Sequence, residues 1–131
     1  MSELTLTLIR GIPGSGKSTL AKKLVQEATD KLVHLEADMF FIDNNGDYHF
    51  QPAQLSDAHQ WCQQQCRLLL KQKQSVIVSN TFIMQWELKP YRQFAKKYNA
   101  RLVIKTCTGN YNSIHNVPVT TLKKMKQQWQ P

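Results

Sequence analysis

The chain has 131 residues, of which 41% are hydrophobic and 20% are charged, a composition typical of a globular protein. A chain of this length forms one core, so we expect a single domain over residues 1–131. No stretch approaches the ~20 apolar residues of a transmembrane helix, which predicts a cytoplasmic protein that binds no membrane. The three cysteines are odd in number and sparse, so we expect reduced thiols.

The first part of the chain predicts two strands and a helix around a glycine-rich run. Leucine alternates with threonine before Ile9 over residues 4–9, which is a strand pattern, and the glycines that follow end it. Apolar residues then recur at one-face helical spacing as far as about residue 29. Residues 32–37 predict a second short strand, and the turn-forming residues 43–47 predict an exposed excursion.

The rest of the chain predicts alternating helices and strands. A long helix is expected over residues 52–71, a buried strand over 75–79, a helix over 86–98 and a strand over 102–104. A basic helix closes the chain after Pro118. The apolar stripe expected on the long helix consists of Leu55, Ala58, Cys62, Cys66 and Leu69. His59 shares that face with the two cysteines, which we interpret as helix packing because a metal site would need a fourth ligand.

Strands separated by helices of this length favour a parallel sheet covered on both faces. The expected fold is therefore a three-layer α/β/α arrangement. Ligands of such folds bind outside the carboxyl ends of the strands. The segments to inspect are Gly11–Ser18, Asp38, Asn80–Phe82 and the residues from Thr108 onward.

The run after the first strand fits the phosphate-loop pattern G-x-x-x-x-G-K-[ST], with a strand before it and a helix opening within it. Its glycines allow main-chain N–H groups to turn toward phosphate oxygens, and the helix N-terminus favours negative charge. Lys17 supplies a positive charge, and Ser18 offers a hydroxyl to Mg²⁺. We therefore expect the chain to bind a nucleoside triphosphate, ATP with Mg²⁺. The expected binding residues are Gly11, Pro13, Gly14, Ser15, Gly16, Lys17, Ser18 and Thr19.

A phosphoryl transfer also needs a group that takes the proton of the acceptor hydroxyl. Asp38 is the candidate, because it directly follows the second predicted strand and so lies at the ligand edge. With Lys17 it forms the expected catalytic pair. The alternative interpretation is that Asp38 caps a helix or turn that begins near Met39.

These residues together resemble the polynucleotide-kinase-like P-loop ATPases, and most of all their small bacterial and phage members. The resemblance covers nearly the whole chain, although only the phosphate loop is specific by itself. It implies a sheet in the order 2-3-1-4, phosphate and Mg²⁺ binding by Lys17 and Ser18, and Asp38 as the base for a 5′-hydroxyl. The segments that carry it are residues 8–19, Asp38, and residues 58–61, 79–81, 86–91 and 115–118.

The chain also departs from the family pattern. Met39 and Phe41 stand where kinases of the family carry a second Asp and an Arg, and Asn80 replaces a frequent aspartate. The lid segment Thr108–Val117 has no Arg or Lys, although a transition-state arginine is worth ~10³ to 10⁵ in phosphoryl transfer. Three functions remain open: a polynucleotide or nucleoside kinase, a nucleotide-binding module with little turnover, and a small-molecule kinase.

The net charge of +8 is concentrated in the second half of the chain. Residues 1–70 hold six Lys or Arg against eight Asp or Glu, whereas the rest holds eleven against Glu87 alone. This asymmetry is interpreted either as a site for single-stranded nucleic acid or as a solvated surface. Several aromatic side chains are candidates to stack on a base, namely Tyr48, Phe50, Trp86 and Tyr111, with packing the preferred interpretation for Trp86.

Overall fold

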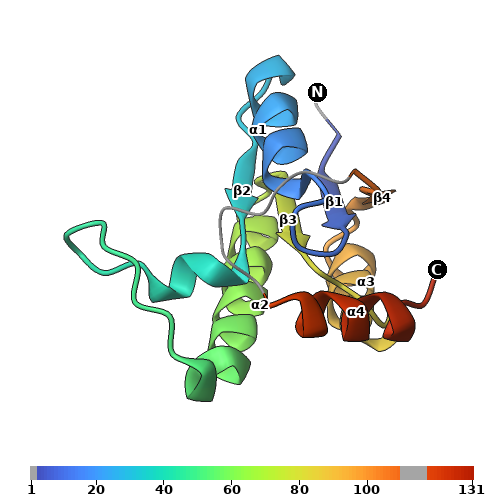
Figure 1. Cartoon of the computed structure of the whole chain (residues 1–131). Coiled ribbons are helices and arrows are strands. Elements are labelled where there is room, and N and C mark those ends of the chain that lie inside the picture. Colours follow the sequence, from blue (N-terminus) through green and yellow to red (C-terminus); the bar gives the residue numbers. More distant parts are fainter. Residues whose placement is uncertain (1–2, 110–117) are drawn as a thin grey trace.

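The computed structural model describes residues 3–109 and 118–131 (Figure 1). Its centre is a parallel four-stranded sheet in the order β2-β3-β1-β4, which confirms the predicted order. The strands are β1 (Thr5–Arg10), β2 (Val33–Leu35), β3 (Val76–Asn80) and β4 (Arg101–Thr106). Strand β1 pairs with both β3 and β4, so the segment that leads into the phosphate loop is held on two sides.

Among the described residues, four α-helices and three short 3₁₀ helices connect and cover the sheet. The α-helices are α1 (Lys17–Glu27), α2 (Leu55–Lys71), α3 (Lys89–Lys97) and α4 (Val119–Gln128). The 3₁₀ helices are η1 (Ala37–Phe41), η2 (Pro52–Gln54) and η3 (Gln85–Leu88). Within the described ranges, no helix has both the length and the apolar character that a membrane span requires.

The alternation of side chains along β1 builds a separate core on each face of the sheet. Leu6 and Leu8 pack in the larger core, beneath α2 and α3. Ile9 points the other way and packs with Ala21 of α1 and Ile77 of β3. Figure 1 shows α1 separated from α2 and α3 by the sheet, which is the three-layer arrangement expected from the sequence.

Two apolar residues lie outside the core, contrary to the sequence interpretation. Leu55 is 44% exposed because the first turn of α2 extends past the sheet (Figure 1), and Leu70 rather than Leu69 completes the buried stripe. Trp86 is 68% exposed. It belongs to η3, whose three residues per turn change the helical phase relative to α3 and direct the indole outward.

An excursion between η1 and α2 projects from the layers, as the turn-forming residues predicted (Figure 1). We call residues 42–50 the aromatic arm. An antiparallel bridge between Ile42 and Tyr48 closes it, and the rings of Tyr48 and Phe50 pack against Phe41. Its Tyr48 and Phe50 side chains are each about half exposed.

Two leucines of α2 provide a matched test of this core. Leu70 is 1% exposed and Leu68 is 41% exposed on the same helix. Leu70→Ala should lower the free energy of unfolding by about 2–5 kcal/mol, because it removes buried methyl groups and leaves a cavity. Leu68→Ala should stay within about 0.5 kcal/mol. Urea unfolding followed by circular dichroism measures both, and equal losses would contradict the assigned helix face.

Candidate functional site

The phosphate loop has the open conformation that its glycines predicted. Gly14 and Gly16 have φ angles of 83° and 98°, a region that side-chain-bearing residues rarely adopt. Helix α1 begins at Lys17 with Gly16 as its N-cap. No side chain of the described residues caps this helix, and its first turn carries no acidic residue. The first N–H groups of α1 and its positive dipole end are therefore available to an anion.

Gly11 lies where there is no space for a side chain. A Cβ atom at this position would lie 2.3 Å from the Ser15 hydroxyl oxygen and 2.8 Å from the carbonyl oxygen of Cys107. The Gly11 N–H donates to the carbonyl of Thr81 at 3.1 Å. The Ser15 hydroxyl is thus buried against Gly11, with no hydrogen-bond partner in the described part of the chain, rather than directed outward.

Lys17 is anchored within the loop and surrounded by acidic groups. Its amine donates to the carbonyl of Ile12 at 3.1 Å. Burial lowers the pKa of Lys17, and the negative charges of Glu36 and Asp38 oppose that shift. Lys17 is therefore close enough to interact with both carboxylates at the end of β2.

Glu36 is a functional candidate that the sequence interpretation missed. It follows β2 directly, and its Oε1 accepts hydrogen bonds from the Ser18 hydroxyl at 2.5 Å and the Ser79 hydroxyl at 2.8 Å. His34 Nε2 lies 3.2 Å from the same oxygen. Burial alone would raise the pKa of Glu36, but hydrogen bonds from His34, Ser18 and Ser79 outweigh that effect and lower the pKa to about 2. The alternating spacing of His34 and Glu36 on a strand is the only sequence signal for this arrangement.

Asp38 lies at the same edge of the sheet, in the first turn of η1. Its carboxylate is exposed and accepts a hydrogen bond from the Tyr48 hydroxyl of the aromatic arm at 3.2 Å. The helix-cap interpretation of Asp38 is wrong, because Glu36 occupies the N-cap position and no side-chain hydrogen bond caps η1 among the described residues. The Asp38 carboxylate is therefore exposed at this edge, with Tyr48 as its hydrogen-bond donor.

Asn80 faces away from this edge, toward α2. Its Oδ1 accepts the N–H of Ala37 at 2.9 Å, and its Nδ2 donates to the Cys62 sulfur at 3.8 Å. Asn80 is 8% exposed, and Cys62 and Cys66 are fully buried in the same core. Asn80 therefore fixes the start of η1, the helix that carries Asp38.

Arg10, the last residue of β1, connects the loop region to the end of the described chain. Its guanidinium donates to the carbonyls of Phe82, at 2.7 and 3.0 Å, and Gln130, at 2.6 Å, and lies 4.2 Å from the centroid of the Trp129 ring. Phe82 has a φ of 45°, an unfavourable conformation for an aromatic residue. Arg10 holds this carbonyl in place and attaches the residues after α4 to it.

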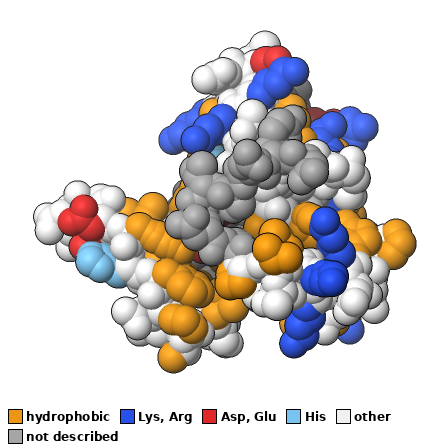
Figure 2. Space-filling view, viewed as in Figure 1, with side chains coloured by type: hydrophobic (Ala, Val, Ile, Leu, Met, Phe, Trp, Pro, Cys, Tyr) orange, Lys and Arg blue, Asp and Glu red, His pale blue; other side chains and the backbone are white. Residues whose placement is uncertain are grey.

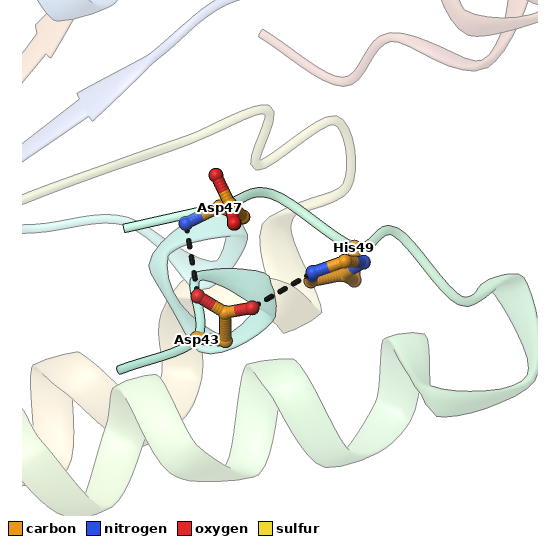
Figure 3. Close-up of side chains that lie close together, drawn as sticks. All are labelled: Asp43, Asp47 and His49. Carbon is orange, nitrogen blue, oxygen red and sulfur yellow. Dashed lines mark hydrogen bonds and ion pairs between the residues drawn. The ribbon is translucent and has the colours of Figure 1, made fainter. Parts of the chain in front are cut away.

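Three residues of the aromatic arm form a cluster that could suggest a metal site, namely Asp43, Asp47 and His49 (Figure 3). Asp43 Oδ1 accepts the N–H groups of Asn45 and Asp47, each at 2.9 Å. Its Oδ2 lies 2.8 Å from His49 Nε2. Both carboxylate oxygens are used within the arm, so the cluster closes a turn.

The basic residues of the second half are exposed in the described ranges. Figure 2 shows blue side chains over α4, where Lys123, Lys124 and Lys126 are exposed. Lys89, Arg92, Lys96 and Lys97 of α3 are exposed as well. Most of the lid segment, with Tyr111 and His115, lies outside the described residues.

A parallel sheet in the order 2-3-1-4, with a glycine-rich loop that leads into the first helix, defines the P-loop kinase fold. Residues 6–131 match the family described as the AAA domain, and the chain belongs to this family of P-loop kinases.

Similar proteins agree with this assignment. Human NEDD4-binding protein 2 is 36% identical over 103 residues, which cover 78% of this chain and 6% of that protein. A chain of the Pnkp1/Rnl/Hen1 complex superposes with a TM-score of 0.67 at 25% identity, covering 95% of this chain and 39% of that one. The Mycobacterium tuberculosis APS kinase CysC, a Cys556Ala mutant, gives 0.64 at 15% identity with 98% of both chains covered. The chain thus spans a small part of the human relative and less than half of the Pnkp1/Rnl/Hen1 complex chain.

Substitutions of two tryptophans test how much the contact between Arg10 and Trp129 contributes to stability, with the exposed Trp86 as the control. Trp129→Ala should lower the free energy of unfolding by about 1–3 kcal/mol, because it removes a cation–π contact and partly buried apolar surface. Trp86→Ala should stay within about 0.5 kcal/mol, since its indole is 68% exposed. Urea titrations of the two variants make the comparison. An undiminished stability of Trp129→Ala would show that the residues after α4 contribute nothing to the fold.

Proposed function

We propose that this protein is an ATP-dependent kinase that transfers the γ-phosphoryl group to a hydroxyl of a polynucleotide or nucleoside. The observation that carries this proposal is the position of an open phosphate loop and an exposed carboxylate, Asp38, at one edge of the sheet. Membership of a P-loop kinase family supports the donor half of the reaction.

The donor side consists mainly of main-chain groups. The Gly11 and Ser15 N–H groups are bonded to the carbonyls of Thr81 and Ile12, so the phosphate oxygens bind the other N–H groups of the loop, including those of the uncapped first turn of α1. Pro13, Gly14 and Gly16 give the loop its shape, and Lys17 places its charge at the β- and γ-phosphates. Ser15 contributes through the packing of the loop, since its hydroxyl is buried.

The residues beside the loop fit a magnesium ion. Mg²⁺ prefers oxygen ligands and retains several waters, and the Ser18 hydroxyl together with the Glu36 carboxylate offers such oxygens. When bound with ATP, Mg²⁺ would supply positive charge that neutralises the charge developing as the γ-phosphoryl group leaves. Ser18 is the residue that would hold it.

Asp38 acts as the general base. As the acceptor oxygen bonds to the γ-phosphorus, the bond from that phosphorus to the β–γ bridging oxygen breaks, and the hydroxyl proton passes to the Asp38 carboxylate. ADP and the phosphorylated acceptor are the products. Tyr48 orients the carboxylate through its hydrogen bond to Oδ1.

A second candidate is a nucleotide-binding module with little turnover, and one observation favours it. The end of β3 brings no negative charge to the loop, because Ser79 is neutral and Asn80 is turned into the core. Transfer of labelled γ-phosphate distinguishes the candidates when it is screened against 5′-hydroxyl DNA, 5′-hydroxyl RNA, nucleosides, small sugars and buffer alone. Label that appears only as inorganic phosphate, or not at all, would favour the module.

Two substitutions separate binding from transfer. Lys17→Ala should lose most ATP affinity in titration calorimetry, because the lysine serves the phosphates and no core. Asp38→Asn should keep ATP affinity and lose about 10²- to 10⁴-fold in transfer rate, because an amide cannot take the proton. The control Asp30→Asn removes an exposed carboxylate outside the site and should change neither. Parental transfer by Asp38→Asn would show that another group is the base.

A polynucleotide acceptor predicts salt-dependent binding. Lys89, Arg92 and Lys96 are exposed on α3, so a bound strand would release counterions. For four backbone contacts, log K should fall against log[salt] with a slope of roughly −3. Fluorescence anisotropy with a 5′-hydroxyl oligonucleotide measures it. Arg92→Glu/Lys96→Glu should weaken binding more than Lys22→Glu/Lys23→Glu, which makes the same charge change on α1. Equal weakening by both pairs would exclude a specific site on α3.

A further inference from the structure

The direction of the Ser18 hydroxyl decides whether this side chain can hold a metal ion. A hydroxyl has one proton and two lone pairs, and a metal ligand must present a lone pair. The Ser18 proton is donated to Glu36 Oε1 at 2.5 Å. Its lone pairs are thereby left for another partner.

The side chains of Ser79 and His34 also direct their protons toward Glu36. Ser79 also donates its proton to Glu36 Oε1, so the Ser79 oxygen accepts from His34 Nε2, which lies 2.7 Å away. The one N–H of His34 Nε2 is therefore shared between Ser79 Oγ at 2.7 Å and Glu36 Oε1 at 3.2 Å, and Ser79 donates to Glu36. These three side chains share the α1 face of the sheet, where Ile77 of β3 also packs.

The two oxygens of Glu36 are used unequally. Oε1 lies within 3.2 Å of all three groups, Ser18, Ser79 and His34. Oε2 accepts no hydrogen bond from any residue in the described ranges, and the Glu36 side chain remains 22% exposed. One oxygen is thus fixed by the protein, and the other has no donor among the described residues.

We propose that Glu36 is the positioning residue for Mg²⁺ in this protein: Oε1 directs the lone pairs of Ser18 to the metal, and Oε2 accepts a hydrogen bond from a metal-bound water. The carboxylate near the metal is then Glu36, which follows the edge strand β2. Strand β3 supplies none, because its last two residues are Ser79 and Asn80. This inference rests on the proposed ATP and Mg²⁺ binding.

The test measures how much Mg²⁺ strengthens ATP binding. Calorimetry gives the ATP dissociation constant with Mg²⁺ and with EDTA for the parental chain, Glu36→Gln and the control Glu27→Gln, an exposed glutamate at the end of α1. Glu36→Gln should reduce the gain from Mg²⁺ by roughly 10- to 100-fold, as expected for a residue that orients a metal ligand. Its affinity without Mg²⁺ should not weaken, and Glu27→Gln should behave as the parent.

The outcomes are distinct. An equal Mg²⁺ gain in Glu36→Gln and the parent would overturn the inference alone, and so would an equal loss of affinity with and without Mg²⁺, which a merely structural role predicts. A parental chain that does not bind ATP would overturn the proposed function and the inference with it. If Glu36→Gln does not fold, Ser79→Ala removes one donor to Oε1 and should reduce the Mg²⁺ gain several-fold; an unchanged gain would then reject the proposal.

Discussion

The close approach of main-chain segments at Gly11 is the constraint on which the carboxyl edge of the sheet depends. The Gly11 N–H bonds to Thr81, the Cys107 N–H bonds to the Arg10 carbonyl at 2.8 Å, and no Cβ atom fits between Ser15 and Cys107. Three chain segments therefore converge on one residue that lacks a side chain. This convergence holds the start of the phosphate loop against the segments at Thr81 and Cys107.

Two cations near that point have different partners. The Arg10 guanidinium is surrounded by carbonyl oxygens and an indole ring, and it joins β1 to the segments at Phe82 and Gln130. The Lys17 amine has one carbonyl partner and nearby carboxylates. Arg10 thus uses its Nε and Nη2 donors to hold the fold together, whereas Lys17 keeps donors for a ligand.

The sequence predicted the phosphate loop and the strands because these depend on local patterns, such as the glycine spacing up to Lys17 and the alternation along β1. It did not identify Glu36, whose role arises where β2, α1 and β3 meet and cannot be derived from spacing alone. Trp86 was misplaced because it lies in a 3₁₀ helix, which shifts its phase relative to α3, and Leu55 was misplaced because periodicity does not show that the first turn of α2 extends past the sheet. Asp38 was located correctly at its strand end, but its Tyr48 partner comes from a loop without periodicity.

The aromatic arm combines contacts of its own with contacts to η1, where its Tyr48 and Phe50 rings pack against the buried Phe41. The Asp43 carboxylate satisfies the turn from within, and Tyr48 reaches Asp38 through one hydrogen bond. The tip of the arm, residues 43–47, is exposed and closed by its own hydrogen bonds, and such a turn is tolerant of changes in length and sequence. Substitutions at the tip of the arm can therefore change the surroundings of Asp38 without disturbing the packing around Gly11, so the two ends of this edge can be altered separately.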